Sequence, residues 1–205
     1  MTLTGLYLHI PFCEKKCVYC DFYSIETTSM MQRFVESLVR EIEIRDVPDR
    51  KITTVFFGGG TPSLMTPAML EKIIAALRVR GTFADDCEWT MECNPGTVTL
   101  ESLQGYRSLG INRLSFGVQS FVAEELKFLY RLHSGEDAVE SMRLAREAGF
   151  SNINMDIMFA LPPQTKESLS YSLDRLLECE PNHVSAYSLV YEHGTPLFAQ
   201  LQKGL

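Results

Sequence analysis

The 205-residue sequence predicts an α/β fold, in which a parallel sheet is curved by right-handed crossovers. Two observations support this class. Six segments rich in Val, Ile, Phe and Tyr recur along the chain, and amphipathic helical patterns separate them. The hydrophobic content of 45% is enough for a packed core. The length suits one domain, and no linker or low-complexity tract divides it.

The expected strands and helices alternate along the chain. Strands are expected over 6–12, 53–58, 88–94, 113–119, 152–159 and 183–190. Helices are expected over 29–46, 66–80, 99–109, 134–148 and 165–179. Start and stop signals support the helices: Thr66 and Ser134 are capping residues, and Pro67 suits a first helical position. Gly110 and Gly149 suit the position past a helix end.

The interior face of the curved sheet is expected to be polar. Side chains of a strand alternate between its two faces, and the apolar set should face the helices. The other set contains Tyr7, His9, Glu92, Gln119 and Asp156. One polar residue in a buried strand is often a satisfied hydrogen bonder. Several that converge from different strands need partners, so the pattern predicts a polar ligand inside the sheet.

Composition narrows the classes of function. The net charge of −7 argues against a protein held to nucleic acid by phosphate contacts, which needs a basic face. No apolar run reaches the ~18 residues of a membrane span, and the start of the chain has no signal-peptide pattern. These features predict a cytoplasmic protein whose cysteines are reduced.

Three cysteines form a cluster in the sequence. Cys13, Cys17 and Cys20 have the spacing C-x3-C-x2-C. A disulfide is disfavoured in the cytoplasm. A structural zinc site needs a fourth ligand, for which His9 or Cys93 is available. An iron–sulfur cluster accepts thiolate ligands, and three of them would leave one iron open for chemistry.

The segment FFGGGTPS at 56–63 follows a strand and precedes a helix. Glycines allow a ligand to approach the backbone closely, although a loop also uses them for its own turn. The pattern is neither the Rossmann fingerprint nor a P-loop.

Together these segments resemble one known group. YLHIPFC, CVYCDF, GGGTP, ECNP, SFGVQSF, RLH and NMDIMFALPPQT occur in the order and spacing of the HemN/HemW group of the radical S-adenosylmethionine (SAM) superfamily. The resemblance runs from Tyr7 to about Thr195. It implies a six-stranded parallel three-quarter (β/α)6 barrel. It also implies a [4Fe-4S] cluster held by Cys13, Cys17 and Cys20, with SAM chelating the open iron.

The resemblance implies a set of SAM contacts in this chain. They are Tyr7, Tyr19, Gly59, Gly60, Thr61, Glu92, Gln119, Arg131, Asp156 and Ala186. The chemistry of the residues agrees: the two acids suit ribose hydroxyls or an ammonium group, and an arginine fork suits a carboxylate. An alternative for Arg131 is a surface side chain paired with Glu124 or Glu125. We expect the cysteines outside the cluster motif not to be ligands; these are Cys87, Cys93 and Cys179.

Phe22 separates two kinds of member within the group. The dehydrogenases carry a further cysteine two residues after the third, and the HemW-type chaperones lack it; Phe22 holds this position. The resemblance therefore favours a protein that binds heme and delivers it to acceptor hemoproteins, with an electron donor for the cluster. The alternative is an oxygen-independent coproporphyrinogen III dehydrogenase that acts on a porphyrinogen. Residues 1–205 are expected to form the radical SAM core, without the C-terminal domain of the family.

Overall fold

The computed structural model describes residues 4–45 and 50–204. Its centre is one six-stranded sheet in which every pair of neighbours is parallel and the order is β1-β2-β3-β4-β5-β6. The strands are β1 Thr4–Ile10, β2 Ile52–Gly59, β3 Phe83–Cys93, β4 Arg113–Gln119, β5 Asn152–Phe159 and β6 His183–Ser188. This sequential parallel order confirms the predicted α/β fold class.

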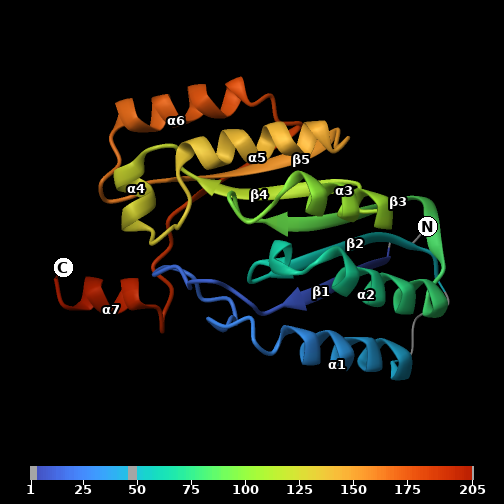
Figure 1. Ribbon diagram of the computed structural model, residues 1–205. Helices are drawn as coiled ribbons and strands as arrows, with labels where there is room; N and C mark the ends of the chain where they lie inside the picture. The colour runs from blue at the N-terminus through green and yellow to red at the C-terminus, as the bar shows by residue number, and fades with distance from the viewer. Residues whose placement is uncertain (1–3, 46–49, 205) are drawn as a thin grey trace.

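Helices connect the strands along the outer side of the sheet, from α1 beside β1 to α6 beyond β5 (Figure 1). Their bounds are α1 Met31–Ile44, α2 Pro67–Arg80, α3 Leu100–Leu109, α4 Ala123–Phe128, α5 Gly135–Glu147, α6 Lys166–Glu178 and α7 Pro196–Gln202, with a short 3-10 helix η1 at Pro62–Leu64. The strands point toward the side of the molecule on which the 11–25 loop, α4 and α7 lie (Figure 1). Loops that follow parallel strands meet there, where ligands of such sheets bind.

The predicted caps are confirmed. The Thr66 side chain accepts a hydrogen bond from the Met69 N–H, and Ser134 accepts from the Asp137 N–H. Gly110, with φ of 104°, ends α3 in the left-handed conformation that glycine adopts without strain.

Some predicted boundaries were wrong. The first strand ends at Ile10 and not at residue 12, because Pro11 has no N–H for the ladder. The third strand begins at Phe83, five residues before the prediction, since the exposed Asp85 and Asp86 conceal its strand pattern. The sixth strand ends at Ser188. Residue 46, the expected end of the first helix, lies outside the described residues.

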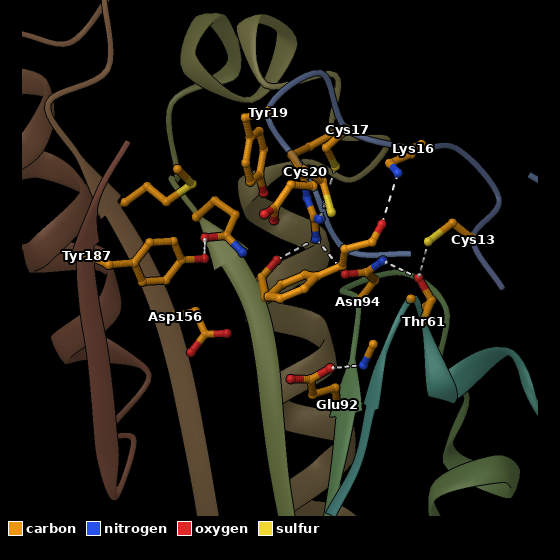
Figure 2. Close-up of a pocket in the computed structure, with 18 of the residues that line it drawn as sticks. Cys13, Lys16, Cys17, Tyr19, Cys20, Thr61, Glu92, Asn94, Asp156 and Tyr187 are labelled. Atoms are coloured by element: carbon orange, nitrogen blue, oxygen red, sulfur yellow. Dashed lines mark hydrogen bonds between the residues drawn. The ribbon is translucent and has the colours of Figure 1, made fainter. Parts of the chain in front are cut away.

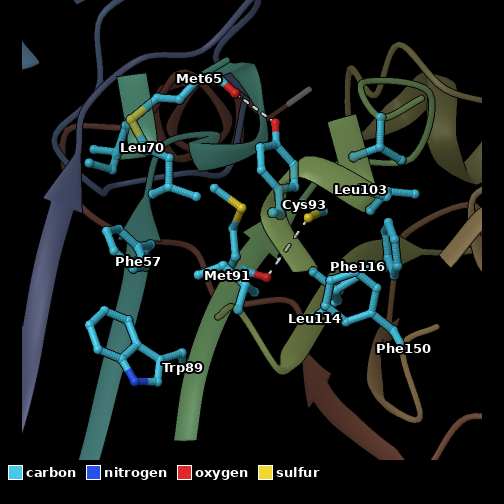
Figure 3. Packing of buried hydrophobic residues seen from close by; sticks show 14 of the residues in the cluster. Phe57, Met65, Leu70, Trp89, Met91, Cys93, Leu103, Leu114, Phe116 and Phe150 are labelled. Atoms are coloured by element: carbon cyan, nitrogen blue, oxygen red, sulfur yellow. Dashed lines mark hydrogen bonds between the residues drawn. The ribbon is translucent and has the colours of Figure 1, made fainter. Parts of the chain in front are cut away.

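The core lies between the sheet and the helices, as the predicted alternation requires. Trp89, Met91 and Cys93 of β3 are buried in it. Figure 3 shows these side chains packed among Phe57, Leu70, Leu103, Leu114 and Phe116, which come from two other strands and two helices. The opposite face of the strands is left for the polar residues that form the site. Among the described residues, no helix is both long and apolar enough to cross a membrane.

Candidate cofactor site

A cavity of about 400 Å³ opens at the carboxyl ends of the strands, a volume within the range of small-molecule sites (Figure 2). The sequence-predicted residues that line it are Cys13, Cys17, Tyr19, Cys20, Gly59, Gly60, Thr61, Glu92, Gln119, Arg131 and Asp156. Two predicted residues lie outside this lining. Tyr7 is 59% exposed and borders a separate hollow beside α1, and Ala186 is exposed on β6.

The loop that carries the three cysteines is closed by its own hydrogen bonds. The Cys13 N–H donates to the Ile25 carbonyl at 3.0 Å, and the Ile25 N–H donates to the Pro11 carbonyl at 2.7 Å. The Lys16 ammonium donates to the Phe22 carbonyl at 2.9 Å. These bonds tie the two ends of the thiol-bearing segment together.

The three thiols approach the cavity from different directions (Figure 2). All six cysteines are free thiols, so the structure does not support a disulfide. Among the described residues, no three Cys, His, Asp or Glu side chains lie close enough together to hold one metal ion. In an iron–sulfur cluster each thiolate binds a different iron, so three thiols that line one cavity fit a cluster without meeting at one point.

His9 lies outside the cavity lining, and Cys93 borders the cavity but is buried. Nδ1 of His9 is hydrogen-bonded to the Tyr7 hydroxyl at 3.2 Å, and Nε2 is bonded to the Tyr23 carbonyl at 2.8 Å. Burial raises the pKa of the Cys93 thiol far above its usual value, which opposes thiolate formation. Cys87 is buried and Cys179 is partly buried, and both lie away from the cavity.

The glycine segment packs against the end of β1. The Gly60 N–H donates to the Ile10 carbonyl at 2.8 Å, and a Cβ at Gly60 would lie 2.5 Å from the Phe12 carbonyl oxygen. The next N–H, of Thr61, donates to the same Phe12 carbonyl at 2.7 Å. Glycine is required here by this close backbone approach. The glycine segment therefore has a structural role in its own turn, and it also lines the cavity.

Two carboxyl groups form the cavity floor. Glu92 accepts a hydrogen bond from the Gly59 N–H at 2.9 Å, and Asp156 accepts one from the Asn154 amide at 2.7 Å. Burial, opposed by the Gly59 bond and reinforced by nearby Asp156, raises the pKa of Glu92 to about 7. Burial also raises the pKa of Asp156. A cationic ligand group would favour the charged form of both carboxyls.

Arg131 lies inside the site and not on a surface helix. Its guanidinium donates at 2.6 Å to the Asn94 side-chain oxygen, at 2.6 Å to the Gly117 carbonyl and at 3.5 Å to Cys17 Sγ. The predicted alternative, a pair with Glu124 or Glu125, does not occur among the ion pairs of the described residues. Nε of Arg131 is buried and has no hydrogen-bond partner in the described part of the chain. A buried donor without a partner suits an anionic ligand.

Sequence reasoning missed two residues that shape the cavity. Asn94 joins the glycine loop to Arg131, because its amide nitrogen donates to Thr61 Oγ1 at 2.9 Å and its oxygen accepts from Arg131. Alternation in the predicted strand 88–94 puts Asn94 on the same face as Glu92, and this signal could have identified it. Tyr187 lines the cavity and donates its hydroxyl to Gln119. Alternation in the predicted sixth strand places Tyr187 on the same face as Ser185, which pairs with Asp156 of β5.

A family model of the radical SAM superfamily matches residues 7–176. The chain is 38% identical over 195 residues to the heme chaperone HemW of Escherichia coli K12, a match that covers 93% of this chain and 52% of that protein. It is 38% identical over 208 residues to the heme chaperone HemW of Bacillus subtilis 168, covering 98% of this chain and 54% of that protein. The chain thus spans about half the length of these curated relatives.

The fold is similar to that of the coproporphyrinogen III oxidase HemN from Escherichia coli, described as a radical SAM enzyme. The TM-score is 0.87 and the sequence identity is 33%, and the match covers 98% of this chain and 47% of that one. The family model extends over most of the described barrel, including the cysteine loop and the cavity residues up to β5. The chain therefore belongs to the radical SAM superfamily, and within it resembles the HemN/HemW group.

Proposed function

We propose that this protein is a radical SAM protein of the HemW type, which binds heme and delivers it to acceptor hemoproteins. Phe22 is the observation that carries the proposal. It lines the cavity two residues after Cys20, and 62% of its surface is exposed. The dehydrogenases of the group have a cysteine at this position. A phenyl ring cannot ligate a metal or supply a thiolate, so the function of that extra thiol is lost here.

The site residues fit the cofactors of the superfamily. Cys13, Cys17 and Cys20 would hold the [4Fe-4S] cluster, because they are reduced and line one cavity. When bound, the cluster and SAM supply one-electron chemistry. In this chain Arg131 would bind the SAM carboxylate, since its buried Nε has no other partner among the described residues. Glu92 would accept hydrogen bonds from the SAM ammonium, and its raised pKa would fall when it does.

The proposal extends to the other SAM contacts. Asp156 and Gln119 would hydrogen-bond ribose hydroxyls, and Tyr19 would pack against the adenine, since all three line the same cavity. The backbone of Gly59, Gly60 and Thr61 would meet the amino group. Tyr7 and Ala186, which the resemblance also implies as contacts, lie outside the cavity lining and would contact SAM only beyond it. A cytoplasmic location suits the reduced thiols, and a one-electron donor would be required for the cluster.

A second candidate function is oxygen-independent coproporphyrinogen III dehydrogenation. The likeness to HemN, with a TM-score of 0.87 over 98% of this chain, favours it. The substitution of cysteine by Phe22 opposes it. The two candidates make opposite predictions for one substrate, so a single experiment separates them.

The experiment uses the protein after anaerobic reconstitution of its cluster. It is incubated with SAM, a reductant and coproporphyrinogen III, and product is followed by chromatography. In a separate experiment it is titrated with heme and followed by absorbance. Heme binding without protoporphyrinogen formation is the expected result. Turnover at the rate of a true dehydrogenase would overturn the chaperone proposal.

A further inference from the structure

Helix α4 ends three residues before Arg131, and few local interactions stabilise this helix. It has only six residues, Ala123–Phe128, and Val122 before it provides no side-chain cap. A helix this short is unstable without tertiary contacts. The position of α4, and of the turn that follows it, must therefore be set by what α4 packs against.

One of these contacts is unusual for a helix of this kind. Glu125 of α4 is only 1% exposed, although carboxylates are rarely buried without a cationic partner. Its carboxylate accepts hydrogen bonds from the Ser120 hydroxyl at 2.6 Å, the Ser168 hydroxyl at 2.6 Å and the Gln164 amide at 3.1 Å. None of the ion pairs formed by the described residues includes it. Neutral donors alone satisfy this buried group.

The three donors belong to segments that line the cavity or flank it. Ser120 directly follows Gln119, the cavity residue at the end of β4. Gln164 also donates to the carbonyl of Met158, a cavity residue of β5, at 3.2 Å. Ser168 lies in α6. The Glu125 carboxylate therefore joins α4 to the ends of two strands and to a neighbouring helix.

A strained turn transmits the position of α4 to the cavity. The Arg131 N–H donates to the Leu126 carbonyl at 2.9 Å, which ties Arg131 to the residue after Glu125. Between them, Tyr130 has φ of 59°, a left-handed conformation that is costly for a residue with a Cβ. Such a turn persists only when the structure on both sides of it is fixed. On one side that structure is α4, and on the other it is the hydrogen-bonded guanidinium.

We propose that Glu125 is a positioning residue, which fixes α4 and through it aims Arg131 at the carboxylate of SAM. Glu125 does not touch the cavity and takes no part in chemistry. The inference rests on the proposed SAM site, and the experiments are chosen so that failure of one can be told from failure of the other.

The first test is SAM affinity in reconstituted Glu125→Gln protein. Glutamine keeps the shape of the side chain, but its amide nitrogen cannot accept the hydrogen bonds that one carboxylate oxygen accepts. The dissociation constant for SAM should rise ~10-fold, with cluster content unchanged. Glu124→Gln, at the exposed neighbouring position, is the matched control and should bind SAM as the wild type does. Unchanged affinity in folded Glu125→Gln protein would overturn the inference.

A double-mutant cycle separates positioning from general loss of stability. If Glu125 acts through Arg131, the Glu125→Gln change should have little further effect on SAM affinity once Arg131 is replaced by Ala. Combined with Glu92→Ala, on another wall of the cavity, the same change should retain its full ~10-fold effect. Equal effects in both backgrounds would mean that Glu125 supports the fold as a whole, which contradicts the inference.

The last test needs no cofactor. The buried Arg131 Nε–H should give a distinct resonance in the NMR spectrum of the unloaded chain, and Glu125→Gln should shift it. Ser168→Ala keeps the carboxylate and removes one donor, so it should shift the resonance in the same direction even if Glu125→Gln fails to fold. An unmoved resonance in Ser168→Ala would contradict the inference. Absence of SAM binding by wild-type protein would instead contradict the proposed cofactor site, and the resonance would still decide the role of Glu125.

Discussion

The Arg131 guanidinium donates a hydrogen bond to Cys17 Sγ at 3.5 Å and thereby joins two residues 114 positions apart in the sequence. The same guanidinium is bonded to Asn94 and to the Gly117 carbonyl. One side chain thus connects the cysteine loop with β4 and with the segment after β3. The loop and the cavity wall are therefore held together by the same side chain that lines the cavity.

The cluster should depend on three of the six cysteines. Replacing Cys13, Cys17 or Cys20 by Ala should abolish the [4Fe-4S] cluster after anaerobic reconstitution, because each would ligate one iron. Replacing Cys87, Cys93 or Cys179 should leave it intact, since Cys87 and Cys93 are buried in the core and Cys179 lies outside the cavity. Iron content and visible absorbance measure the result. A cluster retained in the Cys17→Ala protein would refute the ligand assignment.

SAM affinity should depend on the polar residues of the cavity and not on the cluster ligands alone. Single Ala substitutions of Glu92, Arg131 and Asp156 should each cost about 1–3 kcal/mol, or roughly 5- to 150-fold in affinity, since each leaves a polar group of the ligand unpaired. Iron content should stay unchanged. Calorimetric titration of SAM into the reconstituted variants gives the affinities.

Arg143→Ala is a suitable control, because this arginine is 57% exposed on α5 and pairs only with Glu140 and Glu147 among the described residues. It should bind SAM normally. If all three cavity variants also bound SAM normally, the polar interior of the barrel would serve some other ligand.

The stability of the unliganded protein should depend on pH through Glu92. Its pKa is raised from 4.5 to about 7 by burial, so the folded state holds this proton more tightly than the unfolded state. The stability that this provides is complete below pH 4.5 and is lost as pH rises to 7. Glutamine does not titrate. As pH rises from 4.5 to 7, the free energy of unfolding of Glu92→Gln protein should therefore increase relative to that of the wild type, by at most about 3 kcal/mol.

Denaturant melts at pH 4.5 to 8 measure the difference between the two proteins. Glu124→Gln, at an exposed position of α4, should show no comparable trend. A constant difference between wild type and Glu92→Gln over the whole range would show that Glu92 is ionised in the folded protein throughout.

The sequence predicted the sheet well, because strand alternation and helix caps are local signals. Thr66 and Ser134 cap helices where expected, and Glu92 and Asp156 share the cavity because alternate residues of a strand share a face. The boundaries of the third strand were less predictable. The exposed Asp85 and Asp86 lie in an irregular stretch of β3, between the pairs Ile52–Phe83 and Thr54–Glu88.

Interactions between distant segments had no local signal. Helix α4 has six residues and no capping side chain, so its pattern resembles a loop. The alternative interpretation of Arg131 paired it on the surface with Glu124 or Glu125, whereas Glu125 is buried and bonded to residues 39 and 43 positions away. Nothing in the periodicity of residues 123–131 specifies such partners. They are set by the approach of α6 and the end of β4 in the folded chain.

The proposed cofactor site is tested most directly by the electron paramagnetic resonance spectrum of the reconstituted, reduced protein with and without SAM. We expect the signal of one reduced [4Fe-4S] cluster, whose g-values shift when SAM is added, because SAM would bind the iron that has no cysteine ligand. The shift should be weakened in Arg131→Ala protein at the same SAM concentration. A spectrum unchanged by saturating SAM, or a protein that holds stoichiometric zinc and no iron after anaerobic purification, would contradict the proposed cofactor site.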